Sequence, residues 1–477
     1  MQDSLHDSKK PWIATSTPIT TSAWKATDTH SASLLYGQMG CSQRQPLRTN
    51  SPIALQSRQR TCKAGGFPVN IFLLLYLTIV VKLASVSHSY HSCGPATQPL
   101  RTCIQQLIES PSIRGQDPKN APERFYVIDK QSLQDSVDNW KTLFPGVQAF
   151  YAVKCNPDVG ILRQFASNDL SFDCASSSEI AKVLEIGVHP SRILYANPCK
   201  SLRDLAYAYE NGILRTTVDS LSEIEKTAKN APGMECLVRI FANDPKAQCV
   251  LSNKFGAPPE EWEDLLDAAK EHNIHVVGVS FHVGSGAQSP NAYRTAIKQA
   301  HVFAKLAEMH GFVDCKIIDI GGGFARFRDQ TGPIADDVME ALTECFPVNE
   351  GYQWIAEPGR FMVEHSSTLV TQVIGRKIER SHIAYTVADG LYGSFNCMVY
   401  DHTLPIVRTI YDSLKPKKPS TLYGPTCDGF DTIAKDVELP ELEVGDWVMF
   451  PDMGAYTLAG ASCFNGIPFY QSVSFYV

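Results

Sequence analysis

The feature that most constrains the fold is a regular alternation of short apolar strands and amphipathic helices from Phe125 to about residue 365. Each predicted strand-plus-helix unit takes about 20–40 residues, a spacing typical of a parallel α/β arrangement. About seven or eight such units fit between roughly residues 130 and 365, as expected for a (β/α)8 barrel. We therefore predict an α/β protein with a TIM-like barrel over residues 130–365. Strands are expected at Phe125–Ile128, Gln148–Val153, Arg192–Ala196, Thr216–Asp219, Cys236–Phe241, Val276–His282 and Lys316–Ile320.

The sequence on either side of this region has a different pattern. After Arg360 it becomes rich in β-strand patterns such as Ser367–Ile378, which predicts a mainly antiparallel C-terminal β domain over residues 366–477. Residues 91–129 are expected to supply an N-terminal strand region that joins this β domain. Residues 1–90 form an atypical extension. Its positions 1–66 are rich in Ser, Thr, Gln and Pro without an apolar period, so we expect them to be disordered.

The N-terminal extension contains an apolar run, Phe67–Val81. This run is shorter than the roughly 20 residues of a membrane span, and it lies too far from Met1 for an ordinary signal peptide. An internal signal-anchor and a non-native extension of the reading frame both stay open. The 14 cysteines are scattered without a CxxC pair, as reduced thiols of an intracellular protein are. We expect a cytoplasmic protein, with membrane anchoring through residues 67–81 as the less favoured alternative.

Charge and histidine spacing exclude two further classes of function. The net charge of −7, with no cluster rich in Lys and Arg, argues against a nucleic-acid partner. The 13 histidines form no HExxH or comparable ligand spacing, so no metal site is predicted.

A single lysine, Lys154, follows the apolar strand run Phe150–Val153 and precedes Asn156-Pro157, which ends the strand. Burying an ammonium group at the end of a strand is costly unless the charge is neutralised or the amine is used covalently. Taken alone, a lysine in such a place usually reaches the surface. Motifs further along the chain make it a candidate for chemistry.

Three motifs follow later strands of the predicted barrel, at the carboxyl ends where this architecture places active sites. They are Phe281–Gly286, which contains His282 and Ser285, Asp319–Phe324, which contains three consecutive glycines, and Glu357–Arg360. Each could be only a turn, a satisfied histidine or an ion pair. Consecutive glycines also let backbone amides approach a phosphate, while Arg360 can bind a phosphate and Glu357 can face a cationic ring nitrogen. Together with a lysine able to form a Schiff base, these are the parts of a pyridoxal phosphate site.

Further motifs complete a pattern that extends from about Arg124 to Val477. They are Tyr151–Asn156, Phe172–Ser176, Tyr392–Asn396, Tyr400–His402, Gly424–Gly429 and Asp452–Tyr456. With the glycine motifs, they make the chain closely resemble eukaryotic ornithine decarboxylases, which combine a barrel and a β domain in the alanine-racemase-like fold. The resemblance implies pyridoxal 5'-phosphate as the cofactor and the decarboxylation of L-ornithine to putrescine and CO2.

The resemblance also implies roles for the matching positions around the cofactor. Lys154 matches the Schiff-base lysine, Glu357 the carboxylate that keeps the pyridine nitrogen protonated, and His282 the residue stacked on the ring. The positions that match phosphate-binding residues are Ser285, Gly322, Gly323, Arg360 and Tyr456, and those that match supporting positions are Asp173, Arg239 and Glu179.

On the substrate side, Asp401 and Asp428 match the carboxylates that hold the distal ammonium of ornithine, and Tyr392 and Tyr400 belong to the same substrate-binding set. Cys427 matches the acid that returns a proton to the α-carbon. The catalytic positions implied by the resemblance are therefore Lys154, His282, Glu357 and Cys427.

The family's active sites form at a twofold dimer interface, so the resemblance implies a homodimer with Cys427, Asp428 and Tyr392 supplied by the partner subunit. An antizyme-binding element would lie near Lys200–Ile224, but acidic residues make this segment less basic than the family's element. Two alternatives stay open. One is a decarboxylase for lysine, arginine or diaminopimelate, because the sequence does not give the depth of the pocket. The other is a catalytically silent regulator of the antizyme-inhibitor kind.

Overall fold

The computed structural model describes residues 100–114, 116–117, 120–247, 249, 251–287, 289–325 and 328–477. The apolar run Phe67–Val81 and the predicted disordered region therefore lie outside the described residues. Within the described ranges, no helix has the length and apolar character needed to cross a membrane.

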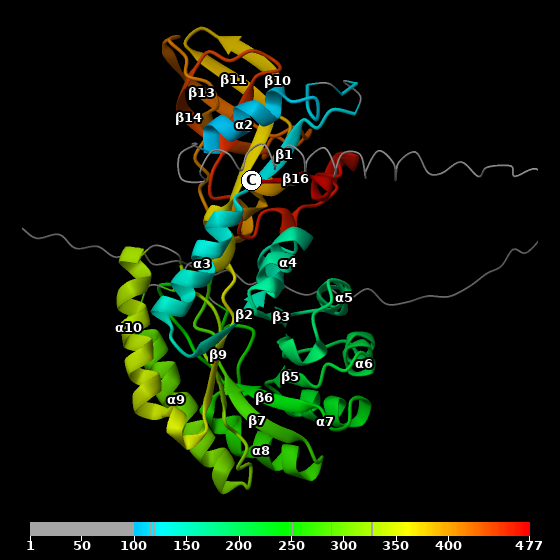
Figure 1. The fold of residues 1–477 in the computed structure, drawn as a ribbon, viewed down its shortest axis with the longest axis vertical. Coiled ribbons are helices and arrows are strands. Elements are labelled where there is room, and N and C mark those ends of the chain that lie inside the picture. The colour runs from blue at the N-terminus through cyan, green and yellow to red at the C-terminus, as the bar shows by residue number, and fades with distance from the viewer. Residues whose placement is uncertain are drawn as a thin grey trace, which may run out of the picture. The chain divides into compact units, whose positions relative to one another are not determined.

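Eight parallel strands close into a barrel, which confirms the predicted fold class. They follow one another in chain order as β2 (Val147–Ala152), β3 (Ser171–Cys174), β4 (Ile193–Tyr195), β5 (Arg215–Val218), β6 (Glu235–Arg239), β7 (His275–Ser280), β8 (Ile317–Asp319) and β9 (Gln353–Ala356). Parallel pairing of β9 with β2, with Ala149 opposite Ala356, closes the barrel. The helices that accompany the strands are α3 (Lys130–Leu143), α4 (Val159–Ser167), α5 (Ser177–Glu185), α6 (Leu202–Glu210), α7 (Leu221–Asn230), α8 (Trp262–Glu271), α9 (Pro290–Met309) and α10 (Arg328–Cys345) (Figure 1).

The barrel interior is filled by side chains from alternate strands. Phe150 of β2, Leu194 of β4, Leu237 of β6 and Ile317 of β8 form one buried cluster, which Ile355 completes. A layer of side chains from every second strand is the usual packing inside such a barrel. The barrel is therefore a solid support for the loops at its carboxyl end.

Polar side chains fix where several helices begin. Asp129, Asp158 and Ser176 accept hydrogen bonds from backbone N–H groups in the first turns of α3, α4 and α5. Such N-terminal caps each stabilise a helix by about 1 kcal/mol. The caps of α4 and α5 hold the chain that leaves β2 and β3, where Lys154 follows β2 and Asp173 lies in β3.

The β domain is assembled from both sides of the barrel in the sequence. Its strands are β1 (Arg124–Ile128), β10 (Ser367–Glu379), β11 (His382–Val387), β12 (Arg408–Thr409), β13 (Lys417–Tyr423), β14 (Thr432–Pro440), β15 (Trp447–Phe450) and β16 (Val473–Tyr476). Strand β1 lies between β10 and β16, antiparallel to the first and parallel to the second. Helix α2 (Leu100–Glu109) packs Ile104 and Ile108 against Phe125 and Trp447 of this sheet.

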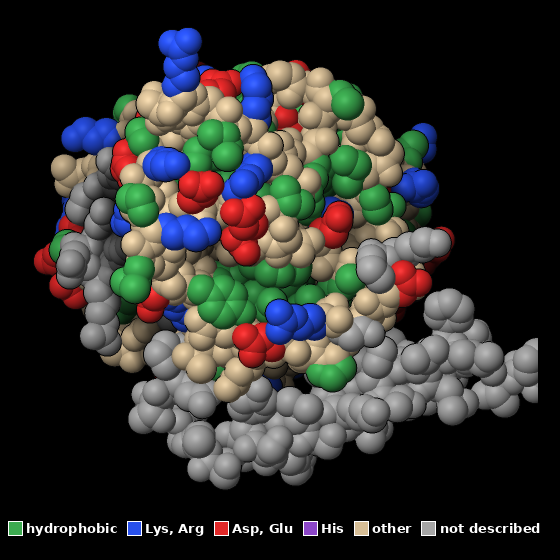
Figure 2. Space-filling view, turned by 90° about the horizontal axis from the view of Figure 1, so that it is seen from above, with side chains coloured by type: hydrophobic (Ala, Val, Ile, Leu, Met, Phe, Trp, Pro, Cys, Tyr) green, Lys and Arg blue, Asp and Glu red, His purple; other side chains and the backbone are tan. Residues whose placement is uncertain are grey.

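The charges on the described residues of one face are of both signs and interspersed with apolar side chains, as Figure 2 shows. Such a face has no extended positive potential that would attract a polyanion.

Candidate active site

Lys154 lies in the 3-10 turn η1 (Val153–Cys155), directly after β2. Its ammonium donates a hydrogen bond to Asp173 on the neighbouring strand β3. Burial lowers the pKa of Lys154, but the charges of Asp173 and Glu357 raise it by more, so that its pKa lies above the ordinary lysine value. The lysine side chain keeps 42% of its surface accessible while the Asp173 side chain is fully buried. A molecule at the barrel mouth can therefore reach the amine, which the hydrogen bond to Asp173 holds in place.

Three buried carboxyl groups, those of Asp173, Asp319 and Glu357, lie near one another at the carboxyl ends of β3, β8 and β9. Burial raises the pKa of Glu357 well above its usual range, and the charges of Asp319 and Asp173 raise it further. Burial likewise raises the pKa of Asp319. Among the described residues, Oδ1 of Asp173 and Oδ2 of Asp319 are buried without a hydrogen-bond partner. The site thus holds more buried acid than the chain itself neutralises, so it suits a ligand that brings a cationic N–H group.

His282 follows β7 and is a neutral imidazole. Its withdrawal from water lowers its pKa well below the usual range, and the charges of Arg239 and Lys154 lower it further. Its Nδ1 accepts a hydrogen bond from the backbone N–H of Gly284 at 3.0 Å, which places the ring proton on Nε2. A neutral, flat ring of this kind can pack on an aromatic ligand without repelling a cation.

The glycine turn after β8 leaves no room for side chains. A Cβ on Gly322 would lie 2.7 Å from the carbonyl oxygen of Glu357, and one on Gly323 would overlap the carbonyl oxygen of Gly284. Gly321 and Gly323 also adopt positive φ angles of 65° and 102°, which glycine adopts at low cost. In the described part of the chain, the N–H groups of Gly322 and Gly323 make no hydrogen bond. They are therefore available to a phosphate, as in other anion-binding turns.

Ser285 lies beside this turn on a short two-residue ladder with Cys249, whose N–H and C=O groups exchange hydrogen bonds with it at 3.1 and 3.0 Å. Arg239 at the end of β6 places its guanidinium 5.0 Å from the centre of the Phe255 ring. Glu179 in α5 accepts a hydrogen bond from the backbone N–H of Ala175 at 2.7 Å and so braces the loop after β3.

Arg360 joins the predicted phosphate position to the predicted substrate position. It begins the short helix α11 (Arg360–Val363), and its Nη2 lies 2.5 Å from both carboxylate oxygens of Asp401. Its Nη1 lies 3.0 Å from Oε1 of Glu364, and its guanidinium carbon lies 5.3 Å from the centre of the Tyr456 ring. The buried Nε has no partner among the described residues and remains a donor for a ligand. Neither the contact with Asp401 nor the role of Glu364 was predicted from the sequence.

Cys427, Asp428 and Tyr392 form a second cluster on the β domain. The Tyr392 hydroxyl donates a hydrogen bond to Asp428, and the buried carboxylate of Asp431 holds the same loop from inside through the N–H groups of Leu391 and Thr426. In the described ranges, no hydrogen bond or ion pair joins this cluster to Lys154 or Glu357. The predicted site residues of one chain thus fall into two groups.

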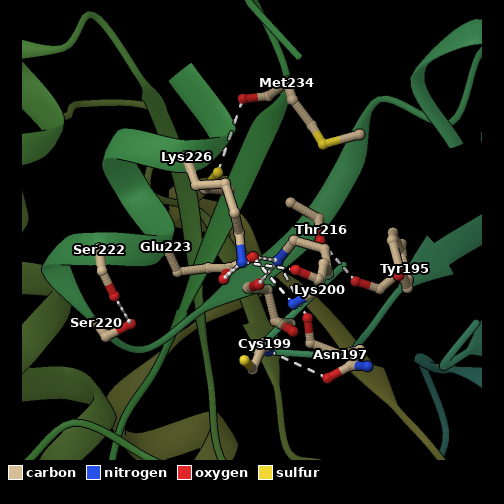
Figure 3. A network of polar contacts seen from close by, with 12 residues as sticks. Tyr195, Asn197, Cys199, Lys200, Thr216, Ser220, Ser222, Glu223, Lys226 and Met234 are labelled. Atoms are coloured by element: carbon tan, nitrogen blue, oxygen red, sulfur yellow. Dashed lines mark hydrogen bonds and ion pairs between the residues drawn. The ribbon is translucent and has the colours of Figure 1, made fainter. Parts of the chain in front are cut away.

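The segment near Lys200–Ile224 contains a buried ionic network (Figure 3). The ammonium of Lys200, which is fully buried, lies 2.9 Å from Oε1 of Glu223 and donates to the carbonyl of Thr217 at 2.8 Å. Lys226 pairs with the other oxygen of Glu223 and donates to the carbonyl of Lys200 at 2.6 Å. Lys200, in this predicted antizyme-binding element, and Lys226, just beyond it, therefore share one carboxylate within the chain itself.

Comparison with known proteins gives a consistent family. Residues 130–364 match the family model described as the pyridoxal binding domain of pyridoxal-dependent decarboxylases. The chloroplastic ornithine decarboxylase of Nicotiana glauca is 41% identical over 365 residues, which are 74% of this chain and 84% of that protein. Antizyme inhibitor 2 of Xenopus laevis is also 41% identical, over 72% of this chain and 79% of its own length.

Among solved structures, the arginine decarboxylase of Paramecium bursaria Chlorella virus bound to agmatine aligns with a TM-score of 0.74 and 38% identity, over 79% of this chain and 100% of that one. The side-chain-free turn, the accessible lysine and the two buried carboxyl oxygens without a hydrogen-bond partner among the described residues fit pyridoxal phosphate. The chain therefore belongs to the pyridoxal-dependent decarboxylases of the alanine-racemase-like fold, the family that includes the ornithine decarboxylases, and its cofactor is pyridoxal phosphate.

Proposed function

We propose that this protein is an ornithine decarboxylase, which converts L-ornithine into putrescine and CO2. The observation that carries the proposal is the position of Lys154, an accessible amine beside the buried carboxylate of Asp173, with Glu357 close enough to raise its pKa. When bound, pyridoxal phosphate supplies an aldehyde that reacts with amines and a ring that accepts the electron pair left by departing CO2. The chain's own residues then have to bind, orient and exchange protons.

Around the cofactor, each group has a task that its environment supports. Lys154 would hold the aldehyde end, and Asp173 would orient its amine. Glu357 would keep a proton at the ring nitrogen, because the negative charge of a buried carboxylate beside that nitrogen favours its cationic form. Arg360 would contribute its free Nε to the phosphate, together with the amides of Gly322 and Gly323.

The remaining cofactor contacts are proposed from position. Ser285 and Tyr456 would complete the phosphate site, His282 would lie on the ring face, and Arg239 would support the same region.

On the substrate side, Asp401 and Asp428 would hold the distal ammonium, with Tyr392 and Tyr400 beside them. A buried ammonium without a partner would cost several kcal/mol, so paired carboxylates select a substrate with an amine at its far end. Cys427 would donate its thiol proton to the α-carbon after CO2 leaves. Donation to the cofactor instead would convert the cofactor to its amine form and stop turnover.

These roles require a second copy of the chain. Cys427 and Asp428 belong to a cluster that is not bonded to Lys154 in the described residues, and the nearby Tyr400 and Phe430 expose 74% and 67% of their surface. We propose a homodimer in which each site combines Lys154 of one subunit with Cys427 of the other. Activity per subunit should fall on dilution below the dimer dissociation constant, in step with the monomer fraction seen by gel filtration. Constant activity in a monomeric fraction would contradict the shared site.

The reaction is assigned to the cytoplasm, because the 11 cysteines in the described part of the chain are free thiols, as in a reducing compartment. Regulation by antizyme is not part of the proposal, since the Lys200 ammonium is buried and both Lys200 and Lys226 are paired with Glu223 within the chain.

The decisive experiment measures CO2 release from ornithine, arginine and lysine in parallel with purified protein. We expect release from ornithine and a visible absorbance band of bound cofactor that Lys154→Ala abolishes. Preferential release from arginine or lysine would identify a decarboxylase of the same family with another substrate. Colourless protein without activity would overturn the enzyme and leave a regulator that resembles antizyme inhibitor 2.

A further inference from the structure

A short 3-10 turn, η8 (Phe464–Gly466), lies against the proposed proton donor. Asn465 and Gly466 in this turn adopt left-handed φ angles of 56° and 74°. Asn and Gly are the residues that adopt this conformation at low cost, and consecutive Asn-Gly is a strong signal for a tight turn. By itself the pair explains only a change of chain direction.

The side chains of this turn reach both members of the Cys427–Asp428 pair. Oδ1 of Asn465 accepts a hydrogen bond from the backbone N–H of Cys427 at 2.9 Å, across 38 positions of sequence. The ring of Phe464 stacks on that of Tyr392, with 4.2 Å between the centroids and 21° between the planes. The hydroxyl of Tyr392 in turn donates to Asp428. The turn thus touches Cys427 directly and Asp428 through one intermediate residue.

Further hydrogen bonds hold this turn and its neighbours in place. The N–H and hydroxyl of Ser462 both donate to the carbonyl oxygen of Tyr392, at 2.9 and 3.0 Å. The hydroxyl of Ser462 also accepts from the N–H of Phe464 at 3.3 Å. The other oxygen of Asp428 accepts from the N–H of Phe430 at 3.0 Å. These bonds orient the carboxylate of Asp428, although the side chains of Phe464 and Cys427 stay exposed on the β domain.

We propose that Asn465 and Phe464 are positioning residues for the decarboxylation reaction, Asn465 for the Cys427 thiol and Phe464 for the Asp428 carboxylate. The inference rests on the proposed function and extends it to residues outside the cofactor site. Misplacing a reacting group by about 1 Å can lower the reaction rate about 100-fold. A hydrogen bond to the backbone of Cys427 therefore affects which atom receives the thiol proton. Phe464, which holds Asp428 in place through Tyr392, instead affects how tightly the site binds the distal ammonium of ornithine.

Four substitutions separate the contacts of the turn from its shape. Asn465→Gly keeps the left-handed conformation and removes the acceptor, whereas Asn465→Asp keeps an acceptor oxygen. Asn273→Gly is the matched control, because Asn273 also has a left-handed φ of 55° but lies in the turn that leads into β7. Phe464→Leu removes the aromatic stack and keeps an apolar side chain.

Each variant is assayed as the full chain loaded with pyridoxal phosphate. The readouts are kcat and KM for ornithine, the fraction of turnovers that leave pyridoxamine phosphate, and deuterium uptake by the Cys427 amide, measured by mass spectrometry. Cys427→Ala supplies the reference for misdirected protonation.

For Asn465→Gly we expect a kcat about tenfold lower, a pyridoxamine phosphate fraction that rises toward that of Cys427→Ala, and faster deuterium uptake at Cys427. Asn465→Asp should retain the slow uptake, and Asn273→Gly should match the unsubstituted protein in every readout. Phe464→Leu should raise KM for ornithine about tenfold, with a smaller effect on the pyridoxamine phosphate fraction.

An unchanged product partition and unchanged deuterium uptake in Asn465→Gly would overturn the positioning role of Asn465, and an unchanged KM in Phe464→Leu would overturn that of Phe464. Failure of the unsubstituted protein to form putrescine would overturn the proposed function instead, so the two failures are distinguishable.

Discussion

The buried pair of Lys200 and Glu223 allows a quantitative prediction about stability. Glu223→Gln keeps the shape of the side chain and a hydrogen-bonding oxygen but removes the charge that compensates a fully buried ammonium. Breaking a buried ion pair by removing one partner costs about 3–5 kcal/mol. Lys200 can avoid an unpaired charge by losing its proton, which costs a lysine at most about 4.6 kcal/mol at pH 7. The expected loss in the free energy of unfolding therefore lies between about 3 and 4.6 kcal/mol.

The sign of the pH dependence provides a second check on the same variant. Burial lowers the pKa of Lys200 even with its partner present, and loss of Glu223 lowers it further. Between that lowered pKa and the ordinary value of about 10.4, the unfolded state binds more protons than the folded state, so stability rises with pH. The deficit of Glu223→Gln should therefore shrink between about pH 7 and 9, by up to about 1.4 kcal/mol per pH unit.

Thermal unfolding followed by circular dichroism measures the effect. A loss of about 3–4.6 kcal/mol corresponds to a fall in melting temperature of roughly 6–18 °C for a domain of this size. Lys226→Gln is the control, because that side chain is 25% exposed and its pair should contribute less than about 1 kcal/mol. The double variant Lys200→Met with Glu223→Leu should be nearly as stable as the unsubstituted protein. A Glu223→Gln variant within 1 °C of the parent at pH 7 would refute the reasoning.

Three other perturbations test the candidate site. Gly323→Ala should weaken cofactor binding at least tenfold in a fluorescence titration, because the new Cβ overlaps a backbone carbonyl; Gly187→Ala, with φ 87° but open space around it, should leave cofactor binding unchanged. In cofactor-free protein, the raised pKa of Asp319 contributes stability that is fully present below about pH 3.9 and is lost as the pH rises through the folded-state pKa. Between about pH 3.9 and that folded-state pKa, thermal unfolding should therefore show a smaller loss of stability for Asp319→Asn than for the unsubstituted protein. Parallel stability profiles of the two proteins against pH would contradict this. Asp401→Asn should alter cofactor affinity as well as KM for ornithine, because Asp401 contacts Arg360; an effect on KM alone would show that the two ends of the site are independent.

The barrel and the cofactor end of the site were predictable because their signals are local. Strands and helices alternate along the chain, and the glycines of Gly321–Gly323 stand next to one another directly after a strand. The carboxyl ends of parallel barrel strands meet at one end of the barrel, so motifs that follow them converge whatever their separation in sequence. Lys154, His282, Glu357 and the glycine turn could therefore be assigned to one site before their contacts were known.

The contacts that couple the site to its surroundings were not predictable, because they join side chains from unrelated segments. Arg360 and Asp401 are 41 positions apart, with strands β10 and β11 between them in the sequence. Lys200 and Glu223 are 23 positions apart on separate βα units, and the sequence pattern does not reveal which lysine of that segment is buried. Asn465-Gly466 did carry a turn signal, but nothing in that signal indicates that its side chain bonds to Cys427.

The strand order of the β domain has a consequence for how the protein is made. Strand β1 leaves the ribosome about 350 residues before its neighbour β16, an interval of roughly 20–70 s at ordinary rates of synthesis. During that time the apolar edge that contains Phe125 and Val127 lacks a partner on one side, and unpaired edges of this kind promote aggregation. The barrel can close meanwhile, since all its strands lie between β1 and β10. Yield during expression should therefore depend on the speed of elongation and on chaperones that cover β1 more than on the stability of the finished barrel.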